Sequence, residues 1–170
     1  MKVLTAYYSR AGENYFSGKI RPVEKGNTEI VAEIINKIEG GTLLKIDRLV
    51  PYSENYKECV SETLADMRKN ARPELTNWLP DIREYDRIYL GYPLYCGTVP
   101  MAVLTFLEHY DFSSLNIYPF CTHEGSGFGK SIQDIEKAAP GAVIHKGLSI
   151  IGDKAASSAD EISSWLKETV

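Results

Sequence analysis

Apolar residues occur along the chain in two patterns, short unbroken runs and stripes at helical spacing. The runs predict buried β-strands, because strands covered on both faces are apolar throughout. The stripes predict amphipathic helices that bury one face. The predicted strands cover residues 2–8, 42–46, 87–91, 116–121 and 142–151. The predicted helices follow residues 26–29, begin near Asn55, run over 100–109 and 131–139, and follow Ser158.

Polar residues and glycines mark the ends of these elements. A polar loop is predicted between the first strand and the first helix, as far as Lys25, and Gly91 with Pro93 is expected to end the third strand. Gly40-Gly41 is expected to end the first helix. The predicted N-terminal caps are Asn27 or Thr28 for the first helix, Asn55 with Glu58 for the second, and Ser158 with Glu161 for the last.

Five strands alternating with five helices predict an α/β fold in a single domain over residues 1–170. The expected architecture is a doubly wound, five-stranded parallel sheet with helices on both faces, in three α/β/α layers. Right-handed crossovers favour the strand order 2-1-3-4-5. Such a sheet binds ligands where its winding reverses, between strands 1 and 3.

Composition narrows the class of partner. The chain has 170 residues, 44% hydrophobic and 25% charged, with a net charge of −4, so we expect no nucleic-acid partner held through phosphates. No apolar run approaches the roughly 20 residues of a membrane span, and the chain enters a strand without a signal peptide. Cys59, Cys96 and Cys121 lack CxxC spacing, which indicates reduced thiols in the cytoplasm and no metal site.

The loops after strands 1, 3 and 4 should meet at one edge of the sheet; they are residues 9–28, 93–98 and 122–129. The first is rich in hydroxyl and amide side chains and ends at a helix N-terminus, which favours a phosphate. It contains neither a nucleoside-triphosphate loop nor a dinucleotide fingerprint. A monophosphate held by neutral donors is therefore predicted.

The other two loops suit a flat ring. Tyr95 offers an aromatic face and Gly97 a flexible peptide, while residues 122–129 offer consecutive backbone donors. A phosphate at one end and a planar aromatic system at the other describe flavin mononucleotide (FMN).

Four segments carry a resemblance over essentially the whole chain: residues 7–10, 26–29, 85–93 and 97–101. They are similar to segments of the flavodoxin-like FMN-binding family, and the third followed by the fourth is the most specific. The resemblance implies that Ser9, Asn27 and Thr28 hold the phosphate. It also implies that Pro93 to Gly97 wrap the isoalloxazine ring and that Thr122 to Gly127 line its other edge.

The candidate cofactor-binding residues are Ser9, Arg10, Asn14, Gly26, Asn27, Thr28, Pro93, Leu94, Tyr95, Cys96, Gly97, Thr122, His123, Glu124, Gly125, Ser126 and Gly127. No catalytic side chain is expected, because the chemistry belongs to the flavin. Residues 11–25 separate the two halves of the phosphate loop. Which half supplies the central donors is open, and so is whether the insertion is plain or a lid.

The resemblance implies electron transfer through a bound flavin, with a redox protein or a small molecule as the partner. The alternative is an NAD(P)H-dependent quinone or flavin oxidoreductase of the same fold, so enzymatic activity is undecided. A third reading is a protein that keeps the fold without the cofactor.

Overall fold

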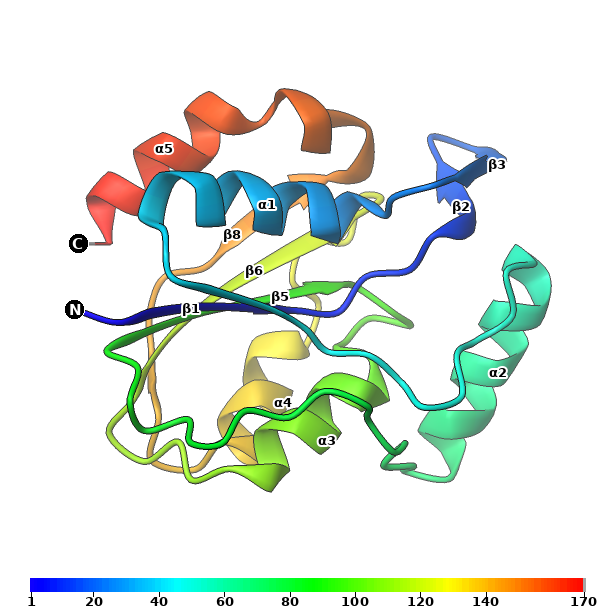
Figure 1. The fold of residues 1–170 in the computed structure, drawn as a ribbon. Helices are drawn as coiled ribbons and strands as arrows, with labels where there is room; N and C mark the ends of the chain where they lie inside the picture. Colours follow the sequence, from blue (N-terminus) through cyan, green and yellow to red (C-terminus); the bar gives the residue numbers. More distant parts are fainter. Residues whose placement is uncertain (170) are drawn as a thin grey trace.

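The computed structural model describes residues 1–169 and has a parallel sheet between layers of helices (Figure 1). Its strands lie in the order β4-β1-β5-β6, and two short strands, β7 and β8, both pair with β6. The predicted order 2-1-3-4-5 is confirmed, with the fifth strand divided into two segments. The bounds are β1 Val3–Tyr7, β4 Thr42–Lys45, β5 Arg87–Pro93, β6 Asn116–His123, β7 Val143–Ile144 and β8 Leu148–Ile151.

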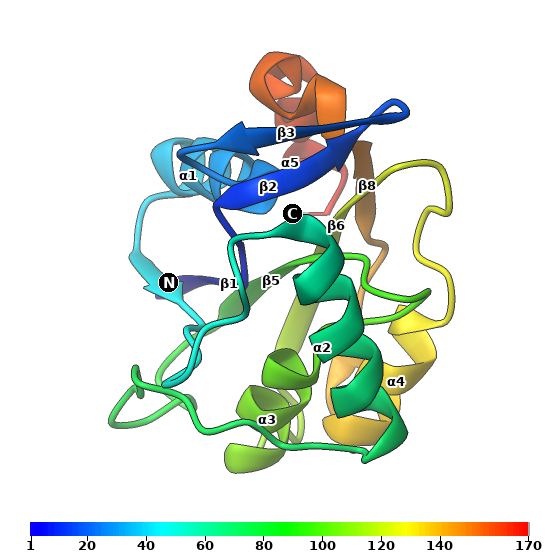
Figure 2. The ribbon, with the colours of Figure 1, turned by 90° about the vertical axis from the view of Figure 1, so that its right-hand side faces the viewer.

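The predicted helices form on both faces of this sheet. Helices α1 and α5 cover one face and α3 and α4 the other, whereas α2 stands at the carboxyl end of the strands (Figures 1 and 2). Each face buries its own apolar cluster against the sheet. The bounds are α1 Asn27–Glu39, α2 Tyr56–Arg68, α3 Met101–His109, α4 Ser131–Ala138 and α5 Ala159–Glu168. Within the described chain, every helix is too short or too polar to cross a bilayer.

The predicted polar loop before α1 is wrong: residues 12–23 form an antiparallel hairpin of β2 Gly12–Phe16 and β3 Lys19–Val23. Ser17 and Gly18 make its two-residue turn with φ of 45° and 90°. Turns of this kind need positive φ at both central residues, which glycine adopts without strain. The hairpin crosses the carboxyl end of the sheet above α2 (Figure 2).

Two other local predictions are wrong. Gly91 does not end its strand, since β5 continues to Pro93; a Cβ at this position would collide with the ring of Phe120 on β6. The capping box of Ser158 does not form either. A 3₁₀ helix, η1 Gly152–Ser157, precedes α5, and Ser158 Oγ donates to the carbonyl of Ala155 at 2.7 Å. The Asn55 cap is confirmed, because its Oδ1 accepts the N–H of Glu58 at 3.1 Å.

Candidate functional site

A cavity of about 390 Å³ lies at the carboxyl edge of the sheet, where the loops after β1, β5 and β6 meet. The structure thus brings together the three loops named from the sequence. The predicted residues that line the cavity are Ser9, Arg10, Asn14, Asn27, Thr28, Pro93, Leu94, Tyr95, Cys96, Gly97, Thr122, His123, Glu124 and Ser126. Gly26, Gly125 and Gly127 are not among its lining residues.

One end of the cavity is the N-terminus of α1. Neither Asn27 nor Thr28 caps this helix through its side chain; instead Ser9, in the loop just after β1, accepts the N–H of Glu29 at its Oγ, at 3.2 Å. A Cβ at Gly26 would collide with Ser9 Oγ, so glycine is what lets the hydroxyl approach. The N–H groups of Asn27 and Thr28 have no protein acceptor among residues 1–169. They therefore offer two free donors at the positive end of a helix dipole.

The other half of the split phosphate loop, residues 9–14, has side-chain donors that are already hydrogen-bonded within the protein. The Arg10 guanidinium donates to the carbonyls of Glu13, Ser53 and Glu54, at 2.5 to 3.1 Å. The Asn14 amide donates to the carbonyls of Arg10 and Gly12. These side chains hold the hairpin and the start of α2 in place, so the donors available to an anion come from Asn27 and Thr28.

The loop after β5 is a tight turn held at both sides. Tyr95 and Thr98 exchange backbone hydrogen bonds of 2.8 and 3.0 Å, and Cys96 and Gly97 have φ of 50° and 81°. The carbonyl of Gly97 accepts the N–H of Lys130 at 2.9 Å. The half-buried ring of Tyr95 packs edge-on against Tyr8, with 5.9 Å between centroids. Burial raises the pKa of Tyr95 well above its usual value.

The loop after β6 is organised around a histidine. His123 Nδ1 accepts the N–H groups of Gly125 at 2.9 Å and Gly127 at 3.1 Å, which assigns the ring proton to Nε2. Burial lowers the pKa of His123, and the carboxylate of Glu124 partly opposes that shift. Gly125 and Gly127 thus hold the loop in shape through their N–H groups, which donate to His123.

Six lining residues were not predicted: Tyr15, Tyr56, Cys59, Val60, Thr63 and Gly152. Four of the six lie on α2, whose apolar positions are equally typical of a core helix. Its sequence carries no signal that the helix stands at the carboxyl edge. A Cβ at Gly152 would collide with Asn27 Nδ2 and Glu124 Oε1, so these two polar side chains both lie against this glycine. Burial raises the pKa of Cys59, which keeps its sulfur a thiol near neutral pH.

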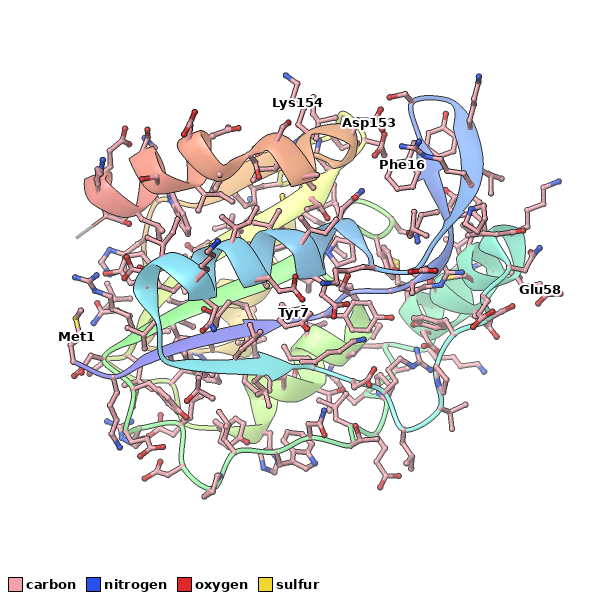
Figure 3. The ribbon with its side chains drawn as sticks, turned by 45° about the horizontal axis from the view of Figure 1, so that its top comes forward. Met1, Tyr7, Phe16, Glu58, Asp153 and Lys154 are labelled. Atoms are coloured by element: carbon pink, nitrogen blue, oxygen red, sulfur yellow. The ribbon has the colours of Figure 1, made fainter. Side chains whose placement is uncertain are left out.

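The β2–β3 hairpin forms one wall of the cavity and is fastened at both ends. At its base, the N–H of Glu13 donates to the carbonyl of Glu54 at 2.8 Å. At its turn, the N–H of Ser17 donates to Glu124 Oε2 at 3.1 Å, and Ser17 Oγ donates to the carboxylate of Asp153. Arg21 pairs with Asp153 at 3.1 Å. Figure 3 shows Asp153 beside the hairpin that carries Phe16, so the insertion bridges α2 and η1.

Among residues 1–169, no three histidine, cysteine, aspartate or glutamate side chains come together as ligands for a metal ion.

Comparisons with known proteins agree with this architecture. The sequence model of a family described as Flavodoxin matches residues 2–169. A proposed flavoprotein from Bacteroides eggerthii is 24% identical, with a TM-score of 0.79 over 99% of this chain and 97% of that one. A proposed flavoprotein from Bacteroides uniformis is 25% identical, with a TM-score of 0.76 over 98% and 97%. A flavoprotein from Lactobacillus acidophilus, solved in complex with FMN, is 22% identical, with a TM-score of 0.66 over 95% and 98%. A search of curated proteins gave no match.

Proposed function

We propose that this chain, which belongs to the flavodoxin family, binds FMN in the cavity at its carboxyl edge and transfers electrons through it. One observation carries the proposal. Free N–H groups of Asn27 and Thr28 face one end of a cavity of about 390 Å³, and two ordered loops enclose its remainder. That volume lies within the usual range of ligand sites, and the helix N-terminus suits a phosphate.

The residues present suit each part of FMN. The N–H groups at the start of α1, with the Asn27 amide and the hydroxyls of Ser9 and Thr28, would hold the phosphate. Residues 93–97 and 122–127 would enclose the ring, while the carboxylate of Glu124 lies toward Gly152 and Asn27 at the phosphate end. A Cβ at Gly97, Gly125 or Gly127 would meet no atom within 4 Å, so these loops leave open space beside them. When bound, the flavin supplies reversible electron transfer, while the protein binds and orients it.

The proposed partner is a redox protein or a small-molecule acceptor, and the proposed location is the cytoplasm. All three cysteines are free, in keeping with a reducing compartment. A second candidate is a quinone or flavin oxidoreductase that takes hydride from NAD(P)H. The weak net charge of −4 favours it, because strongly acidic surfaces are what steer carriers to basic partners.

Titration of the apo-protein with FMN and with riboflavin tests the binding. The visible spectrum should shift on FMN addition, and riboflavin should bind much more weakly because it lacks the phosphate. Equal affinities would contradict the phosphate site, and no binding of either would contradict the proposed function. Anaerobic reduction by NADH or NADPH, followed by quinone addition, separates the two roles. Rapid reduction by a nicotinamide would favour the enzyme.

A further inference from the structure

The first turns of α2 add an aromatic wall to the cavity that none of the three predicted loops contributes. Tyr56 opens this helix, and Cys59, Val60 and Thr63 follow it along the same lining. The Tyr56 ring is half-buried and stacks on Tyr15 of the hairpin, with 6.0 Å between centroids and 25° between planes. Both rings line the cavity.

The position of Tyr56 is fixed from three sides. Its N–H donates to Glu13 Oε2 at 2.9 Å, which joins the helix start to the hairpin. Asn55 caps the same turn through Glu58, and Arg10 holds the preceding carbonyls of Ser53 and Glu54. The ring is therefore presented by a restrained backbone, as a preorganised binding surface requires.

Tyr95 is differently placed. Its ring meets Tyr8 edge-on at 82° and packs against the buried apolar cluster on that face of the sheet. The Tyr95 ring therefore forms part of the inner side of the cavity, next to the core. Tyr56, by contrast, has one face covered by Tyr15, which is itself 40% exposed, and so lies on the outer side of the cavity.

We propose that Tyr56, backed by Tyr15, is the aromatic surface on which the flavin ring stacks, and that the insertion hairpin exists in part to support it. This inference rests on the proposed function. Offset stacking of planar rings is favourable beyond the area that it buries. The hairpin and α2 would thereby supply the aromatic contact that Tyr95, turned toward the core, gives only in part.

Flavin binding to Tyr56→Leu and Tyr56→Phe tests the proposal. Leucine keeps an apolar side chain but removes the ring, so the Kd should rise about tenfold for FMN and for riboflavin alike. Phenylalanine keeps the ring and should bind nearly as the wild type does. The emission of bound FMN should rise in both variants, because a stacked phenol quenches flavin fluorescence and phenylalanine does so poorly. Tyr15→Leu should raise both Kd values by a smaller factor.

Trp78→Leu, an exposed ring away from the cavity, is the matched control and should change neither affinity nor emission. The melting temperature of each apo-variant reports any purely structural effect. Wild-type affinity and emission in Tyr56→Leu would overturn the proposal, as would the full effect appearing in Tyr95→Leu instead. If the wild type bound no flavin, the proposed function would fall together with this inference. Wild-type binding with an unaffected Tyr56→Leu would overturn this inference alone.

Discussion

The side-chain hydroxyls of Thr28 and Thr122 lie 2.8 Å apart, and both residues are buried. This hydrogen bond joins the first turn of α1 to the end of β6, so it fixes two of the cavity-forming loops relative to each other. Thr28→Val or Thr122→Val alone should leave one buried hydroxyl unpaired and lower the free energy of unfolding by about 1–3 kcal/mol. The double variant should lose less free energy of unfolding than the two single variants lose together, because it leaves no unpaired hydroxyl. Urea denaturation of the four proteins measures the coupling, and strict additivity would contradict it.

Gly26 should control phosphate recognition without touching the ligand. In Gly26→Ala the new Cβ would collide with Ser9 Oγ and lie 2.6 Å from the carbonyl oxygen of Arg10, so Ser9 and the backbone beside it must move away from the start of α1. We expect the Kd for FMN to rise at least tenfold, about 1.4 kcal/mol, with a much smaller change for riboflavin. Gly40→Ala at the far end of the helix is the control: with φ of 72° it should lose stability but keep FMN affinity. A parallel loss of both ligands in Gly26→Ala would contradict the prediction.

The carboxylate of Glu124 lies near the free donors of α1, since Glu124 Oε1 and Asn27 Nδ2 flank the same glycine. It should therefore repel a bound phosphate. Glu124→Gln keeps an acceptor for the N–H of Ser17 and should strengthen FMN binding by on the order of 1 kcal/mol, about fivefold, with no gain for riboflavin. Glu136→Gln, the same charge change on exposed α4 residue Glu136, is the control. Raised salt should shrink the difference.

The ordered conformation of the loop after β6 should be lost at low pH, because it is held by neutral His123. Burial holds its pKa below the ordinary 6.5. The unfolded chain therefore takes up the proton at a higher pH than the native loop does. The contribution of neutral His123 to the free energy of unfolding is thus complete above about pH 6.5. It is lost as the pH falls through the native pKa, when Nδ1 becomes a donor and can no longer accept from Gly125 and Gly127.

Amide exchange of Gly125 and Gly127 should accordingly accelerate in mild acid, beyond the intrinsic pH dependence of exchange. His123→Ala should show that faster exchange already at neutral pH, whereas His109→Gln should not. Unchanged protection in His123→Ala would show that the loop is held by other contacts.

The hairpin turn should slow ligand exchange. Ser17 and Arg21 both contact the carboxylate of Asp153, and such exposed contacts contribute on the order of 0.2–1 kcal/mol each. The double variant Ser17→Ala with Arg21→Ala should release FMN about two- to tenfold faster in stopped-flow fluorescence. Lys19→Ala, at the start of β3 next to the turn, is the control. Equal release rates would identify the insertion as a wall that does not move.

The sequence determined the layers of this fold because each rests on a local signal. Unbroken apolar runs and helical stripes place the strands and helices, and chain connectivity with crossover handedness then sets the order 2-1-3-4-5. The three loops at the carboxyl edge follow from that order alone. Even so, the hairpin is not predicted, because its short strands contain Gly12 and Pro22 and no long apolar run, and only the Ser17–Gly18 turn marks it.

Only the tertiary structure decided which donors and rings of those loops are free to contact a ligand. Arg10 and Asn27 are both polar residues near the first βα turn, yet the guanidinium is consumed by backbone carbonyls while the N–H of Asn27 stays free. Tyr95 and Tyr56 are both aromatic, and only packing turns one toward Tyr8 and the other onto Tyr15. These differences depend on partners far away in the chain: Ser53 is 43 residues from Arg10, and Tyr95 is 87 residues from Tyr8. Local patterns record the propensity of a segment, and the partner that uses up a donor or covers a ring is set only when distant segments pack.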